Sequence, residues 1–150
     1  MKLADLLKRL RGECLAFDSR FFLYHLESDS RFEPITSAIL GAVENGKTRA
    51  LASILVLQDL FRRVAEGGNG EAVITCQAIL LNFPNLKFIA IDEQIAADAA
   101  MLQARHGLDA WNALHLSCAR SAKARYFLTG DPGFPMLSEP ETIMLDSIQP

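Results

Sequence analysis

Two aspartates stand at the ends of short apolar runs in this sequence. Asp18 directly follows the run over residues 14–17, and Asp131 follows the run over residues 126–128 after a short turn. Short continuous apolar runs are typical of strands buried on both faces, as in a parallel sheet. Because parallel strands end at the same edge of a sheet, we expect both carboxylates on one edge, where α/β folds usually carry their chemistry.

Two further polar side chains are expected close to that edge, each near the start of a helix. Asp59 falls in an early turn of a helix predicted over residues 54–64, with Ser53 as its expected N-cap. Asn112 falls in the first turn of an amphipathic helix predicted over residues 109 to about 123. Four oxygen-bearing side chains are therefore predicted to converge.

The expected cluster has the ligand types of a metal-dependent hydrolase. Carboxylates repel one another unless a cation neutralises them, and hard oxygen ligands suit Mg²⁺ or Mn²⁺. Such an ion lowers the pKa of a bound water, orients it for in-line attack on a phosphodiester and stabilises the leaving oxygen. Asn112 offers an amide oxygen but no charge. Asp109, one turn earlier on the same face, could replace that charge, although its position favours an N-cap.

Two of the acidic residues also have a purely structural interpretation, which the sequence leaves open. Asp18 could cap the helical segment over residues 20–26, and Asp59 could be favoured by the dipole of its helix. Thr129 could hydrogen-bond the neighbouring acid or a water. His115 has no ligand partners at metal spacing and is interpreted as a hydrogen-bonded packing residue.

Four aromatic side chains raise a similar choice. These are Trp111, Phe21, Phe22 and Phe32. They could stack on nucleic-acid bases, but packing in the core or in an interface explains them as well or better.

The stretch GLDAWNALHLSCARSAKARYFLTGDPGF, over residues 107–134, resembles the C-terminal half of PIN domains, which are small metal-dependent nucleases that include VapC-type toxins. The segment AFDS, ending in Asp18 and Ser19, resembles the family's opening motif of a strand followed by Asp and then Thr or Ser. Two positions depart from the family pattern: Asp59 stands where Glu is usual, and Asn112 stands where Asp is usual.

The resemblance implies a Mg²⁺- or Mn²⁺-dependent ribonuclease. Its metal ligands would be Asp18, Asp59 and Asp131, with Asn112 as a weakened fourth member of the catalytic set. The resemblance also implies an RNA substrate, a small antitoxin that inserts a segment near the acidic site, and a homodimer.

Both departures reduce the acidic character of the expected site, and this favours a second hypothesis. A PIN-like fold that has lost catalysis could serve as an RNA- or protein-binding module. The motif also leaves open a nuclease that acts on DNA or on a particular nucleic-acid structure.

The elements that must position these residues alternate between strands and helices. This order, without hairpin signals, predicts an α/β fold of three α/β/α layers around a mostly parallel sheet, in a single domain over residues 1–150, and the resemblance implies that this domain is PIN-like. Residues 1–11 have leucines at helical spacing and are expected to form an N-terminal helical extension to it. The other helices are predicted over residues 20–26, 34–45, 54–64, 71–81, 92–106 and 109–123, and the strands over 14–17, 50–52, 86–91, 126–128 and 142–145.

Composition excludes several classes of protein. The net charge of −3 argues against a sequence-independent nucleic-acid coat protein, which would normally be basic. The three cysteines are odd in number and lack metal-type spacing, so buried reduced thiols are expected. Charges interrupt the N-terminal apolar residues, and no apolar run is long enough to cross a bilayer. We therefore expect a cytoplasmic protein without a membrane role.

Overall fold

The computed structural model describes all 150 residues and has a five-stranded sheet at its centre. All neighbouring strands are parallel, and their order is β3-β2-β1-β4-β5. The central strand β1 pairs Ala16 with Leu51 on one side and with Phe127 on the other. The strands are β1 (Cys14–Phe17), β2 (Arg49–Ser53), β3 (Leu86–Ile89), β4 (Tyr126–Thr129) and β5 (Glu141–Met144).

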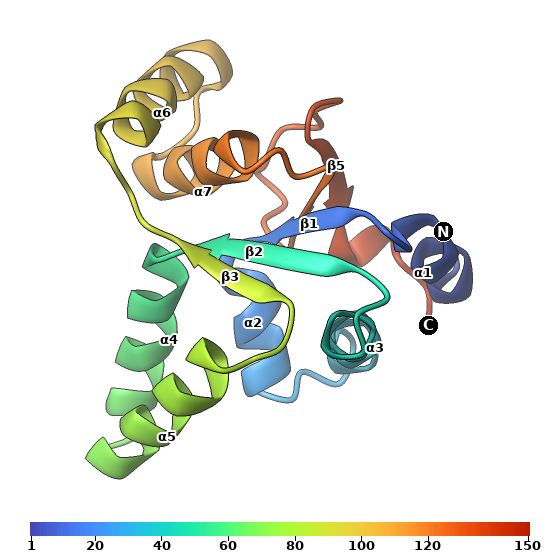
Figure 1. Ribbon diagram of the computed structural model, residues 1–150, viewed down its shortest axis with the longest axis vertical. Helices are drawn as coiled ribbons and strands as arrows, with labels where there is room; N and C mark the ends of the chain where they lie inside the picture. The colour runs from blue at the N-terminus through green and yellow to red at the C-terminus, as the bar shows by residue number, and fades with distance from the viewer.

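Helices cover both faces of this sheet, which confirms the predicted three-layer α/β/α fold (Figure 1). One layer contains α6 and α7, and α2, α3, α4 and α5 lie on the opposite side. The helices are α1 (Leu3–Leu10), α2 (Ser19–Leu26), α3 (Glu33–Glu44), α4 (Leu55–Ala65), α5 (Gly70–Leu81), α6 (Glu93–His106) and α7 (Ala110–Ser121), followed near the end of the chain by a 3₁₀ turn, η1 (Leu145–Ser147).

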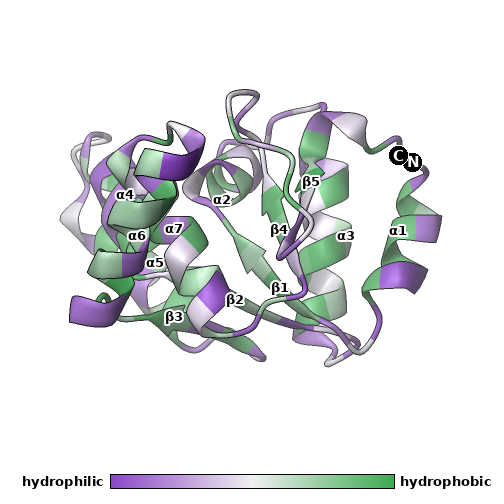
Figure 2. Cartoon of the chain, turned by 90° about the horizontal axis from the view of Figure 1, so that it is seen from above, coloured by the Kyte–Doolittle hydropathy of each residue, from purple (hydrophilic) through white to green (hydrophobic).

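Alternate residues of β1 and β4 contribute to two separate cores, because successive strand side chains point to opposite faces. Phe17 and Leu128 belong to the larger core beneath α2 and α3, whereas Ala16 and Phe127 belong to the smaller core beneath α6 and α7. Because residues of these strands pack into both cores, the strands appear in the sequence as continuous hydrophobic runs, as their colouring in Figure 2 indicates.

Two local predictions are wrong in ways that matter later. Ser53 does not cap α4: it is the last residue of β2, and the N-cap residue Ile54 makes no side-chain hydrogen bond. Strand β3 ends at Ile89 instead of residue 91, and Asp92 caps α6 by accepting a hydrogen bond from the Ile95 backbone.

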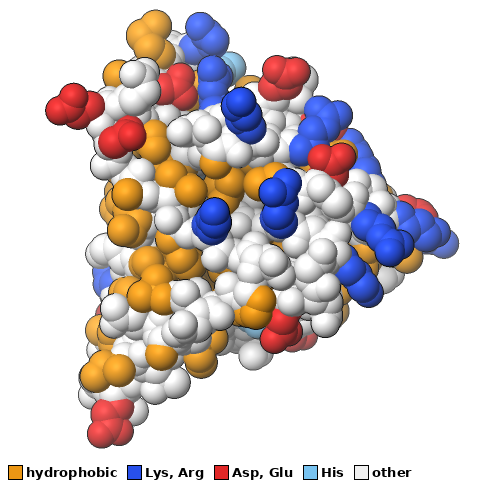
Figure 3. Space-filling model, in the orientation of Figure 1, with side chains coloured by type: hydrophobic (Ala, Val, Ile, Leu, Met, Phe, Trp, Pro, Cys, Tyr) orange, Lys and Arg blue, Asp and Glu red, His pale blue; other side chains and the backbone are white.

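Helix α5 is apolar but has no buried residue. Ile74 and Ile79 are 67% and 60% exposed. Beside α5 lies an apolar groove of about 570 Å³, whose walls come from α2, α4 and α5 and whose floor includes Leu60. Apolar side chains gather over α4 and α5 at the lower left of Figure 3.

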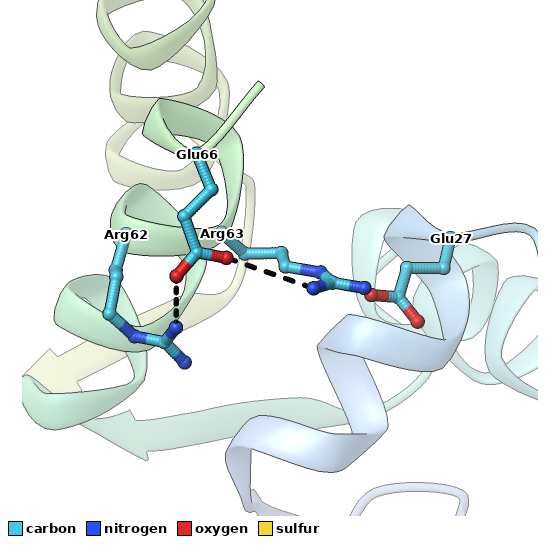
Figure 4. Close-up of polar contacts among 4 residues, drawn as sticks. All are labelled: Glu27, Arg62, Arg63 and Glu66. Atoms are coloured by element: carbon cyan, nitrogen blue, oxygen red, sulfur yellow. Dashed lines mark hydrogen bonds and ion pairs between the residues drawn. The ribbon is translucent and has the colours of Figure 1, made fainter. Parts of the chain in front are cut away.

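A cluster of four charged side chains links α4 to the end of α2 near this groove. Arg63 Nε lies 2.6 Å from a carboxylate oxygen of Glu27, and Arg62 and Arg63 both contact Glu66 (Figure 4). All four side chains are about half exposed, so the cluster contributes little to stability.

The N-terminal helix α1 joins the two ends of the chain. Lys2 forms a parallel bridge with Gln149, and the amino group of Met1 donates to the carbonyl of Ser147 at 2.8 Å. Arg9 contacts Glu141 at the start of β5. The predicted helical extension therefore packs against the C-terminal segment.

The three cysteines are free, as expected, but only Cys118 is buried. Cys14 and Cys76 are partly exposed. None of the helices is both long enough and apolar enough to span a bilayer.

Candidate active site

Asp18 lies just past the carboxyl end of β1 and is almost fully buried. Its Oδ1 accepts a hydrogen bond from the backbone N–H of Phe21 at 2.9 Å and so caps α2. Its Oδ2 accepts one from Thr129 Oγ1 at 2.5 Å. The stacked rings of Phe17 and Phe21, with centroids 3.9 Å apart, fasten α2 to β1. The helix cap uses Oδ1 of Asp18, and Oδ2 is directed toward β4. Asp18 can therefore be both a helix cap and a residue of the site.

Asp131 follows β4 and is partly exposed. Its Oδ1 accepts from the Gly133 backbone at 3.0 Å, and its Oδ2 accepts from Asn112 Nδ2 at 2.7 Å. Its own backbone N–H donates to Thr129 Oγ1 at 2.9 Å. The Thr129 hydroxyl donates to the carboxylate of Asp18, not to that of Asp131, and thereby ties the ends of β1 and β4 together.

Asn112 lies one turn into α7, and Asp109 caps that helix. Asp109 Oδ1 accepts from the Asn112 backbone at 2.9 Å, and its Oδ2 accepts from Asn112 Nδ2 at 3.0 Å. The same Nδ2 donates to Asp131. The amide of Asn112 therefore bridges two carboxylates.

Asp59, in α4, is reached from α7 through a chain of hydrogen bonds. Ser53 Oγ lies 2.7 Å from Nδ1 of His115, and Nε2 of His115 lies 3.4 Å from Ser19 Oγ. The Ser19 hydroxyl donates to Asp59. Because that hydroxyl is already used as a donor, it accepts from His115, and this assigns the proton of the neutral ring to Nε2. His115 is buried, as predicted for a packing residue, but it also holds Ser19 beneath Asp59.

Burial and hydrogen bonding shift the pKa values of three of these groups. Burial raises the pKa of Asp18 to about 6, against the hydrogen bonds from Thr129 and the backbone that lower it. Burial also acts to raise the pKa of Asp131, but hydrogen bonds from Gly133 and Asn112 and the charge of Arg20 outweigh it and lower that pKa. Burial lowers the pKa of His115 to about 4, so the ring is neutral near pH 7.

All four predicted site residues line one pocket of about 260 Å³. It lies at the carboxyl edge of the sheet, where Asp18 and Asp131 follow β1 and β4. The complete lining is Asp18, Ser19, Arg20, Leu23, Asp59, Asp109, Trp111, Asn112, His115 and Asp131.

The sequence predicts no role in the site for the pocket residues Ser19, Arg20 and Leu23. Ser19 was named as part of the AFDS motif, and its place directly after Asp18 was a usable signal, because a hydroxyl there lies beside the first carboxylate. Arg20 had no such signal. The other aromatic candidates, Phe21, Phe22 and Phe32, are buried in the larger core, whereas Trp111 is 42% exposed at the pocket.

The model of the PIN domain family matches residues 15–139, a span that includes every residue of this pocket. The chain belongs to the PIN domain family. PIN domains are generally nucleases, so the pocket is that of a nuclease family. No curated protein sequence matches the chain.

Solved structures with the same fold include components of toxin-antitoxin systems. A toxin-antitoxin complex from Klebsiella pneumoniae has a TM-score of 0.67 at 13% identity, covering 87% of this chain and 97% of that chain. VapBC2 from Rickettsia felis, bound to a DNA fragment from its promoter, has a TM-score of 0.65 at 15% identity, with coverages of 87% and 98%. FitAcB from Neisseria gonorrhoeae has a TM-score of 0.58 at 19% identity, with coverages of 79% and 88%. At these identities the likeness establishes the fold of this PIN domain.

The side chains of the pocket fit a divalent metal in the type of atom they offer. Carboxylate, amide and hydroxyl oxygens are the hard ligands that Mg²⁺ and Mn²⁺ prefer, and the nitrogens of His115 are engaged by two serines. No three Asp, Glu, His or Cys side chains lie close enough together to hold an ion between them. Each carboxylate instead accepts a hydrogen bond from a neighbour: Thr129 for Asp18, Ser19 for Asp59 and Asn112 for Asp131.

Proposed function

We propose that this PIN domain is a Mg²⁺- or Mn²⁺-dependent ribonuclease that hydrolyses phosphodiester bonds. The observation that carries the proposal is that Asp18, Asp59 and Asp131, which are far apart in the sequence, line one pocket at the carboxyl edge of the sheet. These carboxylates are the metal ligands of the proposal, and Asn112 adds an amide oxygen.

An ion bound there supplies an activated water and stabilises the oxygen that leaves. The protein contributes position and charge. Thr129 and Phe21 fix Asp18, and Ser19, held by His115, fixes Asp59. Exposed Arg20 brings a positive charge to the pocket, which suits a phosphate, and half-exposed Trp111 offers a ring face to a base.

A cleavage assay with end-labelled single-stranded RNA, and DNA of the same sequence, tests this proposal. We expect RNA cleavage in Mg²⁺ or Mn²⁺, none in EDTA, and loss of cleavage in Asp18→Asn and Asp131→Asn. Asp18→Asn keeps a residue that can cap α2, so its fold should persist. If the protein cleaved DNA and not RNA, the substrate would be DNA instead of RNA. If the wild-type protein neither cleaved nucleic acid nor took up metal, the proposed nuclease activity would be wrong.

One observation favours the binding module as a second candidate function. The Asn112 amide donates hydrogen bonds to both Asp109 and Asp131, as it would in a pocket that holds no ion. RNA binding without cleavage, unchanged by EDTA, would identify that function.

We propose further that the protein acts in the cytoplasm, as one unit over its 150 residues, with a small antitoxin-like partner and as a homodimer. Support for a partner comes from the toxin-antitoxin complexes that share the fold and from the uncovered apolar groove beside α5. Co-expression with the product of a short adjacent reading frame tests this partnership. We expect a complex that Ile79→Asp weakens, because the charge would have to be buried in it.

A further inference from the structure

Asp109 does more in this structure than cap α7. An N-cap needs one acceptor, and Oδ1 of Asp109 fulfils that role toward the backbone of Asn112. The second oxygen, Oδ2, is directed to Asn112 Nδ2, which also lies 2.7 Å from Oδ2 of Asp131. A single nitrogen thus lies within hydrogen-bonding distance of carboxylate oxygens from two aspartates, so these two oxygens converge.

Asp92 provides an internal comparison. It is also an exposed aspartate at the N-cap of a helix, and its Oδ1 accepts from the Ile95 backbone at 2.8 Å. Only Asp109 lines the candidate active site. The charges of Asp59 and Asp109 also act to raise the pKa of His115, although burial outweighs them and lowers it.

We propose that Asp109 supplies the carboxylate that residue 112 lacks and is the fourth acidic ligand of the divalent ion; this rests on the proposed metal-dependent function. The four carboxylates of the pocket are then Asp18, Asp59, Asp109 and Asp131. Asp109, the N-cap of α7, stands three residues before Asn112, so the two side chains lie on the same face at the start of the helix.

The Asn112 amide has a defined part in this arrangement. Without an ion, its N–H groups hold Asp109 and Asp131 together and offset their repulsion. If an ion were bound, Asp109 and Asp131 would be held by the cation in place of these hydrogen bonds, and Asn112 would offer its amide oxygen, since its N–H groups cannot serve as ligands.

Calorimetric titration with Mn²⁺ tests the proposal without relying on activity. The variants are Asp109→Asn, Asn112→Asp and the double exchange Asp109→Asn/Asn112→Asp, with Asp92→Asn as the matched control. Asparagine caps helices about as well as aspartate, so these changes alter charge while keeping the cap. Asp109→Ser, another good cap, serves as a second variant if Asp109→Asn does not fold.

We expect Asp109→Asn to weaken Mn²⁺ binding by about tenfold or more, and Asn112→Asp to strengthen it by a similar factor. The double exchange should bind Mn²⁺ about as tightly as the wild type, and Asp92→Asn should be unchanged.

Two results would overturn the inference while leaving the proposed function intact. One is wild-type affinity in Asp109→Asn together with lost binding in Asp131→Asn, and the other is a double exchange that does not recover. A wild-type protein that takes up no Mn²⁺ would overturn both.

Discussion

The candidate active site is lined mainly by polar and charged side chains, whereas the groove beside α5 is lined mainly by apolar ones. In the pocket, Asp18, Asp59 and Asp131 each accept a hydrogen bond from a side chain on another element. Along the groove, no side chain of α5 is fully buried, and several apolar ones are exposed. The polar groups of the pocket are therefore paired within the chain, whereas the apolar side chains of the groove are only partly covered by it.

The difference predicts which property each region controls. Removing charge from the exposed and half-exposed carboxylates of the pocket should change chemistry but hardly change stability, because such groups contribute little to it. The buried floor of the groove should contribute to the stability of the fold. Its exposed rim should affect neither stability nor cleavage, and is expected to matter for binding, because large exposed apolar surfaces usually mark interaction sites.

The largest effect is expected from Asp59→Asn. Nuclease activity should fall by about a hundredfold or more, as is typical when one electrostatic group at a reacting centre is lost. The melting temperature should stay close to that of the wild type, because the amide oxygen of asparagine can still accept from Ser19. Asp146→Asn, on an exposed aspartate outside the pocket, is the control. Unchanged cleavage in Asp59→Asn would remove Asp59 from the catalytic set.

Leu60→Ala should be the most destabilising change in the groove. Leu60 is 2% exposed, so truncation leaves a cavity and should lower the free energy of unfolding by about 3 kcal/mol in urea titration. The same truncation at Leu81, an α5 residue that is 53% exposed and lies outside the groove lining, should cost less than about 0.5 kcal/mol. Equal losses at the two leucines would mean that burial of Leu60 does not decide its contribution to stability.

The third prediction concerns the pH dependence of stability in EDTA. The pKa of Asp18 is about 6 in the folded protein, against an ordinary value of 3.8, so its contribution to stability falls as pH rises from about 4 to about 6. The pKa of His115 is about 4, against 6.5, so its contribution is full above about 6.5 and is lost as pH falls toward 4. Each amounts to at most about 3 kcal/mol, and the two opposing slopes should leave the wild type nearly flat between pH 4 and 6.

Single variants should separate the two slopes. In urea titrations at several pH values, Asp18→Asn should become more stable as pH rises over this window, and His115→Gln should become less stable. Profiles that stay parallel to that of the wild type in both variants would contradict the opposed titration.

The smallest effect is expected from Ile79→Ser on the rim of the groove. Because Ile79 is 60% exposed, the free energy of unfolding should change by less than about 0.5 kcal/mol, and the cleavage rate should not change. Urea titration and the RNA cleavage assay measure both. A loss above about 1 kcal/mol would show that α5 is packed more firmly than its exposure indicates.

Much of the fold could be predicted from the sequence, because its strands are short apolar runs and its helices have local start signals. Strand β1 has the predicted bounds, and α7 begins at its predicted cap, Asp109. The carboxyl ends of β1 and β4 were sufficient to place Asp18 and Asp131 on one edge, since parallel strands leave no other choice.

What could not be predicted depends on contacts between distant residues. Serine before a helix is locally favoured as a cap, yet Ser53 contacts His115, which is 62 positions away. The chain from His115 through Ser19 to Asp59 has no local signal at all. The exposure of α5 was equally hidden, because a helix that is apolar all round is usually buried.

The contact between the two ends of the chain has a practical consequence. Gln149 donates its backbone N–H to the carbonyl of Met1 at 2.9 Å, and Figure 1 shows both termini beside α1. A short glycine-rich linker can therefore close the polypeptide into a ring, and a new opening at the Gly67–Asn69 turn would yield a circular permutant with the same architecture.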